Sequence, residues 1–322
     1  MKNYFKFNLT GKQLLPIWLV FMALVVLPYF YMIYNLVTSF GHKLNAAPGS
    51  IADAVKLMFI VILAVLIVGF AIYFFITKMS IENTEYKEES LLFDGKFGPF
   101  LGMFLKGIVL SIITIGIYIP WFTENIYDFF AEKTTYKSNR FEFLGKGVQL
   151  LKIALLYYIL PLIIASIVIG IFFGRGSEHA LLKNTVTQIT TLFIAIPFMY
   201  LRYKWMVNVK YKDYLIQWDT EFWSSCKTIL LQVFLTVITF GIYYPLALVK
   251  LYKYFAEKTV ANSDKGTKKF GYDIEVQDDF LFIWGQWLLT IITLGIYYPW
   301  GFCKIADRIL SKTYLEEVAV TE

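Results

Sequence analysis

Two acidic pairs are the side chains in this sequence that come nearest to catalytic chemistry. Glu88-Glu89 and Asp278-Asp279 have the composition of a general acid and base, but both lie in polar stretches, where solvated surface charge is the expected role. No phosphate-binding loop, dinucleotide fingerprint, zinc-protease motif or nucleophile elbow occurs. Two cysteines and two histidines are too few for a disulfide framework or a histidine-based metal site. We therefore expect no enzymatic activity, no catalytic residue, no metal and no cofactor.

A different constellation, Thr-x-Gly-Ile-Tyr-x-Pro, occurs three times within apolar runs. Glycine is conformationally permissive, and proline removes a backbone donor and clashes with the preceding turn, so the motif interrupts a helix. The threonine hydroxyl can bond a carbonyl near the break, and the tyrosine supplies a hydroxyl. The candidate site residues are Thr114, Gly116, Tyr118, Pro120, Thr239, Gly241, Tyr243, Pro245, Thr293, Gly295, Tyr297 and Pro299.

Two interpretations of the repeated motif stay open. A broken helix could line a substrate site, as in transporters built from repeats. Alternatively, the segment ends at the membrane surface and its proline starts an amphipathic interfacial helix. Lys250 and Lys253 share a helical face opposite Leu251 and Tyr254, which favours the interfacial helix. The lysines predicted to contact lipid headgroups are Lys133, Lys250, Lys253, Lys258 and Lys312.

The composition indicates which elements must position these residues. The chain has 322 residues, of which 58% are hydrophobic and 17% charged, whereas soluble domains are about 45–50% apolar and about 25% charged. This excludes a soluble globular enzyme and a disordered chain. We predict an all-α polytopic integral membrane protein. Apolar runs long enough to cross a membrane lie at 14–36, 54–77 and 148–173, and a shorter run at 186–201 can be extended through Tyr203. The runs with the motif lie at 97–122, 228–249 and 280–302.

The sequence also contains an internal repeat. Asn83–Thr134 aligns without a gap on Asn208–Thr259, with nineteen identical positions, and a third copy of the motif follows the second by 54 residues. We predict an internally duplicated helical bundle within one membrane domain. The first repeat (1–137) and the second (138–276) each hold two spans and one motif, and 277–322 is a partial third repeat.

These motifs carry a resemblance to a known family. The Thr-x-Gly-Ile-Tyr-x-Pro-Trp core and Phe141-x-Phe143-x-Gly145 resemble the YjgN-like family of bacterial inner-membrane proteins, a domain of unknown function, over roughly 93–316. The chain departs from the family in having Lys before Thr134 and Leu246 in place of a tryptophan. The resemblance implies a multi-pass protein of the bacterial inner membrane, and it implies no activity and no catalytic residues.

The distribution of charge predicts the orientation. If all seven apolar runs cross the membrane, the two sides receive 14 and 12 basic loop residues, which is no bias. If the three motif segments instead enter and leave on one side, 23 basic loop residues lie on that side and three on the other, as expected of a cytoplasmic face. We therefore predict four full spans plus three re-entrant or interfacial segments, with the N-terminus cytoplasmic. The net charge of +6 is read as this orientation signal, and we expect no nucleic-acid partner.

Two functions fit these expectations. No acid or histidine lies deep in an apolar run, which disfavours ion coupling, so the first hypothesis is an uncoupled conduit or transporter for a small molecule or lipid. The alternative is a non-transport membrane protein that organises lipid or scaffolds a partner through amphipathic basic helices at 120–136, 245–260 and 299–315. Membrane lipids are the expected partners, while a homo-oligomer or another protein partner is left open.

Overall fold

The computed structural model describes residues 2–42, 48–174 and 180–317, and it contains a large antiparallel sheet. The prediction of an all-α bundle is therefore wrong. The sheet has 11 strands in the order β3-β2-β1-β11-β10-β9-β8-β7-β6-β5-β4. Their bounds are β1 Asn3–Phe7, β2 Thr84–Tyr86, β3 Glu89–Ser90, β4 Leu92–Phe93, β5 Thr134–Tyr136, β6 Asn139–Phe143, β7 Val209–Tyr211, β8 Tyr214–Trp218, β9 Thr259–Ser263, β10 Gly266–Tyr272 and β11 Thr313–Glu317.

The strands were not predicted because they are short and lie in charged segments between apolar runs. In β6, Phe141 and Phe143 are the less exposed positions, and Arg140 and Glu142 face solvent, so one face of the strand is aromatic and the other charged. The turn between β5 and β6 places Lys137 and Ser138 at positive φ, 48° and 62°. Tight hairpin turns of this type usually contain Asn-Gly or Asp-Gly, and this turn contains neither.

The sheet nearly closes into a barrel. Its two edge strands, β3 and β4, are separated in the chain only by Leu91. Across that gap the Tyr136 hydroxyl donates to the Tyr86 carbonyl at 2.9 Å, and the Lys137 ammonium lies 3.3 Å from the Glu89 carboxylate. Two strands away from β3, β1 pairs with both β2 and β11, so the first and last strands of the chain lie side by side in the sheet.

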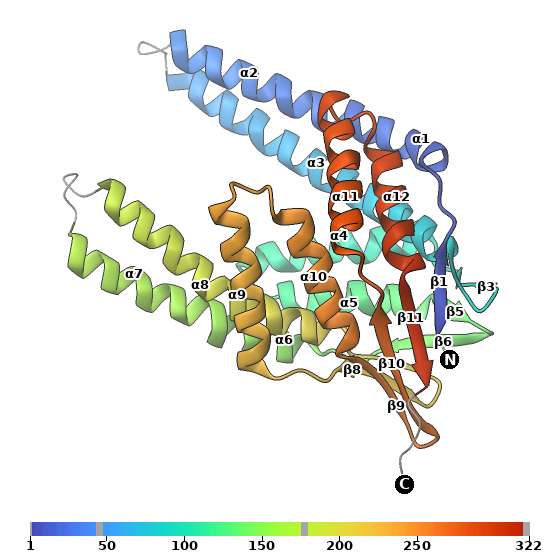
Figure 1. Cartoon of the computed structure of the whole chain (residues 1–322). Coiled ribbons are helices and arrows are strands. Elements are labelled where there is room, and N and C mark those ends of the chain that lie inside the picture. The colour runs from blue at the N-terminus through green and yellow to red at the C-terminus, as the bar shows by residue number, and fades with distance from the viewer. Residues whose placement is uncertain (1, 43–47, 175–179, 318–322) are drawn as a thin grey trace.

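Helices leave the sheet in pairs, and each pair returns to it. Figure 1 shows the sheet at the lower right and the helices extending to the left and the top. Two of the pairs are long, α1 to α3 and α6 to α8. Their bounds are α1 Gly11–Phe21, η1 Met22–Val26, α2 Leu27–His42, α3 Pro48–Glu82, α6 Gly147–Ala154, η2 Leu155–Ile159, α7 Leu160–Phe173 and α8 Ala180–Met206. Within the described residues, four helices are long and apolar enough to cross a membrane: Gly11–Tyr34, Met58–Glu82, Gly147–Phe173 and Ala180–Met206.

The three motif segments form shorter pairs, which we call the short hairpins. They are α4 Phe97–Ile113 with α5 Ile119–Glu132, α9 Phe222–Ile238 with α10 Tyr244–Glu257, and α11 Val276–Ile292 with α12 Tyr298–Ser311. Because a strand precedes and follows each pair, both of its ends lie at the sheet. Helices of 14 and 17 residues are about 21 and 25 Å long, shorter than the ~30 Å of hydrocarbon that a span must cross.

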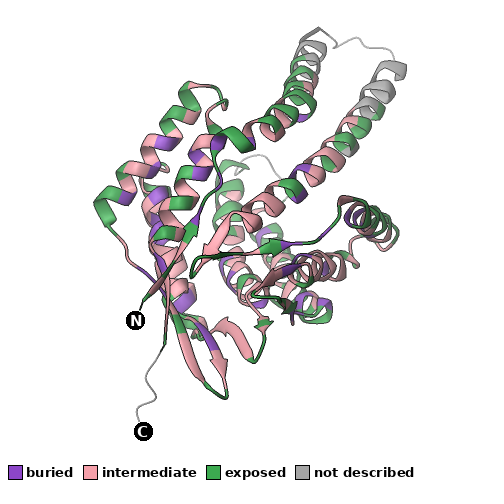
Figure 2. Ribbon diagram, turned by 90° about the vertical axis from the view of Figure 1, so that its right-hand side faces the viewer, coloured by how far each residue is buried: buried purple, intermediate pink, exposed green. Residues whose placement is uncertain are grey.

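Neighbouring helix pairs pack on one another around the sheet. α5 packs on α6, α8 on α9, α10 on α11, and α12 returns to α1. Close approach is built into two of these contacts, since a Cβ on Gly11 would lie 2.5 Å from the Trp300 ring and one on Gly147 2.8 Å from the Trp121 ring. Figure 2 shows buried residues mainly near the sheet and along these contacts, and many exposed ones on the outer helix surfaces.

The proposed repeat boundaries can be placed on this architecture. The boundary at 137/138 falls in the turn between β5 and β6, and the one at 276/277 falls in the first turn of α11. Both lie at the sheet rather than in the helical pairs. The division into repeats stays a prediction.

Candidate functional site

Each motif forms the tip of a short hairpin, and all three tips have the same hydrogen bonds. At the first tip the Thr114 hydroxyl donates to the Leu110 carbonyl at 2.7 Å and accepts from the Tyr118 amide at 3.0 Å. Thr239 and Thr293 repeat both bonds at the same distances. The predicted threonine-to-carbonyl bond is thereby confirmed. The threonine is the C-cap of the first helix, and its hydroxyl also accepts from the amide of the tyrosine at the N-cap of the second.

A left-handed residue follows the threonine at each tip. Ile115, Phe240 and Leu294 have φ of 51°, 50° and 49°. The next residue is Gly116, Gly241 or Gly295, and its amide donates five residues back, as to Ser111. This is the Schellman arrangement, in which the left-handed position is normally glycine because a Cβ there is strained. Large apolar residues hold that position here.

Those strained side chains are also the most exposed apolar groups of their hairpins. Ile115 is 93% exposed, Phe240 97% and Leu294 85%. The prolines behave differently, since Pro120, Pro245 and Pro299 are buried at the start of the second helix, where a missing N–H has no cost. The motif therefore turns the chain back and presents one bare apolar side chain at its end.

Indoles from neighbouring helices cover two of the three tips. Trp284 of α11 donates its ring N–H to the Ile242 carbonyl at 2.8 Å, and Trp18 of α1 donates to the Gly295 carbonyl at 2.9 Å. Carbonyls freed by a helix break need such partners in an apolar medium. At the first tip no indole bond is found among the described residues, and a shallow cleft of about 260 Å³ is lined by Thr114, Ile117, Tyr118 and Trp121.

Two hairpins contain a chain of polar side chains, anchored on a buried glutamine, that sequence reasoning missed. In α9/α10 the Tyr243 hydroxyl donates to the Gln232 side-chain carbonyl at 2.9 Å and accepts from the Lys250 ammonium at 3.1 Å. Gln232 is buried. The tyrosine ring thus folds back from the tip between the two helices, and its hydroxyl ties α9 to α10.

The same chain recurs 54 residues later. Tyr297 donates to Gln286 at 2.9 Å and accepts from Lys304 at 3.0 Å, and Gln286 is also buried. The first hairpin differs, because Gly107 stands at the glutamine position and Asn125 at the lysine position. The 54-residue offset was visible in the sequence, and following it away from the motif would have found both glutamines.

Three of the predicted headgroup lysines have a structural role through the backbone. Lys133, Lys258 and Lys312 are the C-cap residues that directly follow α5, α10 and α12. Each carbonyl accepts from the amide of the aspartate that precedes the same hairpin, at 2.8–3.0 Å. These aspartates are Asp94, Asp219 and Asp273. The bond closes each hairpin at its base.

The lysine side chains divide into paired and unpaired groups. Lys253 lies 3.6 Å from Glu257, and Lys312 lies 2.6 Å from Asp279. In the described part of the chain, the side chains of Lys133 and Lys258 have no partner. The motif residues therefore lie at the tips, whereas most of the predicted headgroup lysines lie toward the base. Lys250 is the exception, because its ammonium donates to the Tyr243 hydroxyl of the motif.

Asp279 corrects the interpretation of the acidic pairs. Asp278 is exposed, but Asp279 is only 1% exposed. Its carboxylate accepts from Arg308 and Lys312, each at 2.6 Å, and from the Tyr272 hydroxyl at 3.2 Å. Burial alone would raise the pKa of this carboxyl, but the hydrogen bonds from Lys312, Arg308 and the Glu275 amide outweigh it and lower the pKa. The group is a buried structural ion pair and not solvated charge.

A comparison with known families matches residues 88–287 to a bacterial protein family of unknown function, DUF898, also called the YjgN family. The match covers most of the chain, from β3 into α11. The chain belongs to this family. The resemblance carried by the Gly-Tyr-Pro motif is thereby confirmed. No curated protein and no solved structure matches the chain.

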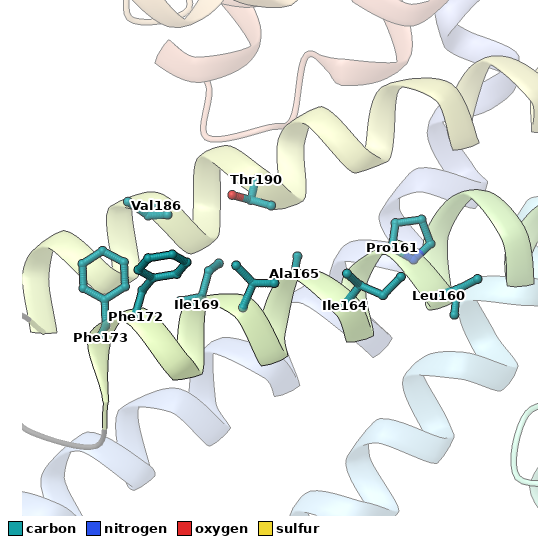
Figure 3. A pocket seen from close by; sticks show the side chains of 10 residues that line it. Leu160, Pro161, Ile164, Ala165, Ile169, Phe172, Phe173, Val186 and Thr190 are labelled. Atoms are coloured by element: carbon teal, nitrogen blue, oxygen red, sulfur yellow. The ribbon is translucent and has the colours of Figure 1, made fainter.

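For this DUF898 member, the four apolar helices are compatible with a membrane location. A cleft with a volume of about 510 Å³ lies on them, between α7 and α8. Figure 3 shows Ile164, Ile169 and Phe172 along α7, with Val186 and Thr190 on α8. Its lining is almost wholly apolar, so it suits an acyl chain better than a polar solute.

Proposed function

We propose that this DUF898 protein organises membrane lipid by inserting its short hairpins into one leaflet. The two long helix pairs cross the membrane and anchor the molecule, and the sheet stays in water on the cytoplasmic side of the bacterial inner membrane. The three short hairpins enter from that side and return to it. Their combined volume expands the leaflet that they enter and leaves the opposite leaflet unchanged, which favours curvature.

The observation that carries the proposal is the residue at each tip. Ile115, Phe240 and Leu294 each combine a strained left-handed backbone with 85–97% exposure. In water both features are unfavourable, and glycine or asparagine would relieve them. In hydrocarbon the exposed side chain becomes favourable and offsets the strain. The same choice at three tips points to insertion.

A conduit for a small molecule remains the second candidate, and the geometry gives it less support. The clefts found among the described residues are lined mainly by apolar side chains. The tip residues point outward, and tryptophan covers carbonyls at two tips. A path through the breaks would instead need polar side chains facing one another.

Depth measurements test the insertion. We expect bimane attached at Ile242, in a Cys226→Ala, Cys303→Ala background, to be quenched by lipids brominated on their acyl chains and protected from aqueous iodide. The triple variant Ile115→Asn, Phe240→Asn, Leu294→Asn should lose most of the quenching yet stay folded, since asparagine tolerates the left-handed region. The triple variant should also lose the membrane curvature that we expect the wild type to cause in proteoliposomes. Curvature is measured from their diameters by cryo-electron microscopy.

A bimane at Lys87, in a turn of the sheet, is the matched control and should respond only to iodide. Iodide quenching at Ile242 in the wild type would rule out insertion. Flux of a dye or labelled lipid through proteoliposomes, abolished by Gly241→Leu, would instead establish the conduit.

A further inference from the structure

The two polar chains in the second and third short hairpins have the properties of an anion site. Lys250 and Lys304 are bonded to a tyrosine hydroxyl and to no carboxylate within the described residues. Because the tyrosine is neutral, the lysine charge is not compensated. An ammonium has three donors, so each lysine keeps two N–H groups for another acceptor.

Contacts with neighbouring side chains fix the positions of the two ammonium groups. Tyr243 is fixed by its bond to buried Gln232, and the Lys250 ammonium also lies 5.5 Å from the centre of the Tyr243 ring. The Lys304 ammonium lies 5.7 Å from the centre of the Tyr297 ring, and Tyr297 is fixed in the same way by its bond to Gln286. Fixing the donor before binding reduces the entropy lost when an anion arrives.

Depth identifies the anion. Lys250 is six residues along α10 from Tyr244, which is about 9 Å from the tip. The large exposed side chains on the tip side of this level are apolar and include Ile238, Phe240 and Ile242. Interfacial helices bury their apolar part by about 5–10 Å. With the tip at that depth, the ammonium lies at the level of the phospholipid phosphates.

We infer that Lys250 and Lys304 each bind the phosphate of a phospholipid in the leaflet that the hairpins enter. The bond is charge-assisted, from the ammonium to a non-bridging phosphate oxygen, and the tyrosine and glutamine position the ammonium for it. The short hairpin α4/α5 has no such site, since Gly107 and Asn125 replace the glutamine and the lysine. This inference rests on the hairpin insertion proposed above.

Native mass spectrometry of the full chain, released from vesicles of phosphatidylcholine and phosphatidylglycerol, tests the inference. We expect the wild type to retain two more phospholipids per chain than Lys250→Met, Lys304→Met, and each single variant to lose one. Lys253→Met, which removes a lysine paired with Glu257 on the same helix, and Asn125→Met, at the equivalent place in α4/α5, should lose none. Equal retention by the wild type and the double variant would overturn the assignment.

Three further arms separate the possible causes of a change. Lys250→Arg, Lys304→Arg keeps the charge and should keep the lipids, so loss there as large as with methionine would contradict a phosphate contact. Displacement of the two lipids by millimolar inorganic phosphate would mean that the site takes soluble phosphate, against our assignment. Bimane quenching at Ile242 should be unchanged in the double methionine variant, so failure of the lipid site can be told from failure of insertion.

Discussion

At the scale of single residues, one buried position shows how the three short hairpins differ. The equivalent residues in the first turns of α4, α9 and α11 are Phe100, Ser225 and Asp279, and each is 0–1% exposed. Phe100 lies against the Phe129 ring, Ser225 shares a hydrogen bond with Tyr254, and Asp279 pairs with Arg308. The backbone site is the same, whereas the interaction is aromatic, neutral polar or ionic.

Removing the ion pair at Asp279 should lower the stability of the folded protein. We predict that Asp279→Asn lowers the free energy of unfolding in detergent by about 3–5 kcal/mol at neutral pH, because Arg308 and Lys312 lose their buried partner. Asp278→Asn, at the exposed neighbour, should change it by less than about 0.5 kcal/mol. Urea titrations at pH 7 measure both.

The same carboxyl gives the stability a dependence on pH. The pKa of Asp279 is lower in the folded state than in the unfolded chain, so its contribution is present above the unfolded pKa of ~3.9 and is lost as the pH falls through the folded pKa. The difference between wild type and Asp279→Asn should therefore narrow below about pH 4. A difference that stays constant down to pH 2 would contradict the assigned pKa direction.

At the scale of elements, the threonine, glycine, tyrosine and proline of the motif could be predicted from the sequence, because their chemistry is local. The threonine bonds within its own turn, and proline starts a helix at any depth. The 54-residue offset singles out Gln232, but the roles of Gln232 and Asp279 could not be predicted, because each depends on a partner beyond its own helix in the hairpin. Only a fold in which the helices return to the sheet brings these partners together.

Two glycines of α4 should respond to the same substitution with opposite signs. A Cβ on Gly107 would lie 2.1 Å from the Phe122 ring of α5, whereas one on Gly102 meets nothing within 4 Å. We predict that Gly107→Ala destabilises the protein by about 1–3 kcal/mol through overpacking. Gly102→Ala should stabilise it by up to about 1 kcal/mol through helix propensity. Thermal unfolding in detergent measures both, and equal shifts would refute the packing of α4 on α5.

At the scale of the whole molecule, the sequence identified the family and the apolar helices and missed the sheet. A membrane-crossing helix can be recognised in a sequence from about 20 consecutive apolar residues. A strand of two to seven residues carries at most a few alternations, and these strands are assembled from segments far apart in the chain. Strand β1 illustrates this, since Asn3 pairs with Leu315.

That pairing gives a prediction about the sheet as a unit. Phe5 of β1 stacks on Tyr86 at 4.8 Å and on Phe270 at 6.2 Å between ring centres. We predict that Phe5→Ala costs about 3 kcal/mol, the low end for this substitution because the ring is only half-buried. Amide hydrogen exchange should quicken in both β2 and β11. Faster exchange in β2 alone would show that β1 does not join the chain ends. Leu92→Ala, at an exposed position of β4, is the control and should leave both strands protected.

The place of β1 between β2 and β11 also determines the order in which the strands can pair during synthesis. Its edge toward β2 can pair once the first long helix pair has been made, but its other edge must wait for β11. Roughly 300 residues separate the two strands, and at about 5–20 residues per second a ribosome needs ~15–60 s to make them. During that interval all helix pairs emerge while β1 still lacks its β11 partner, so the membrane insertion that we propose can begin before the sheet is complete.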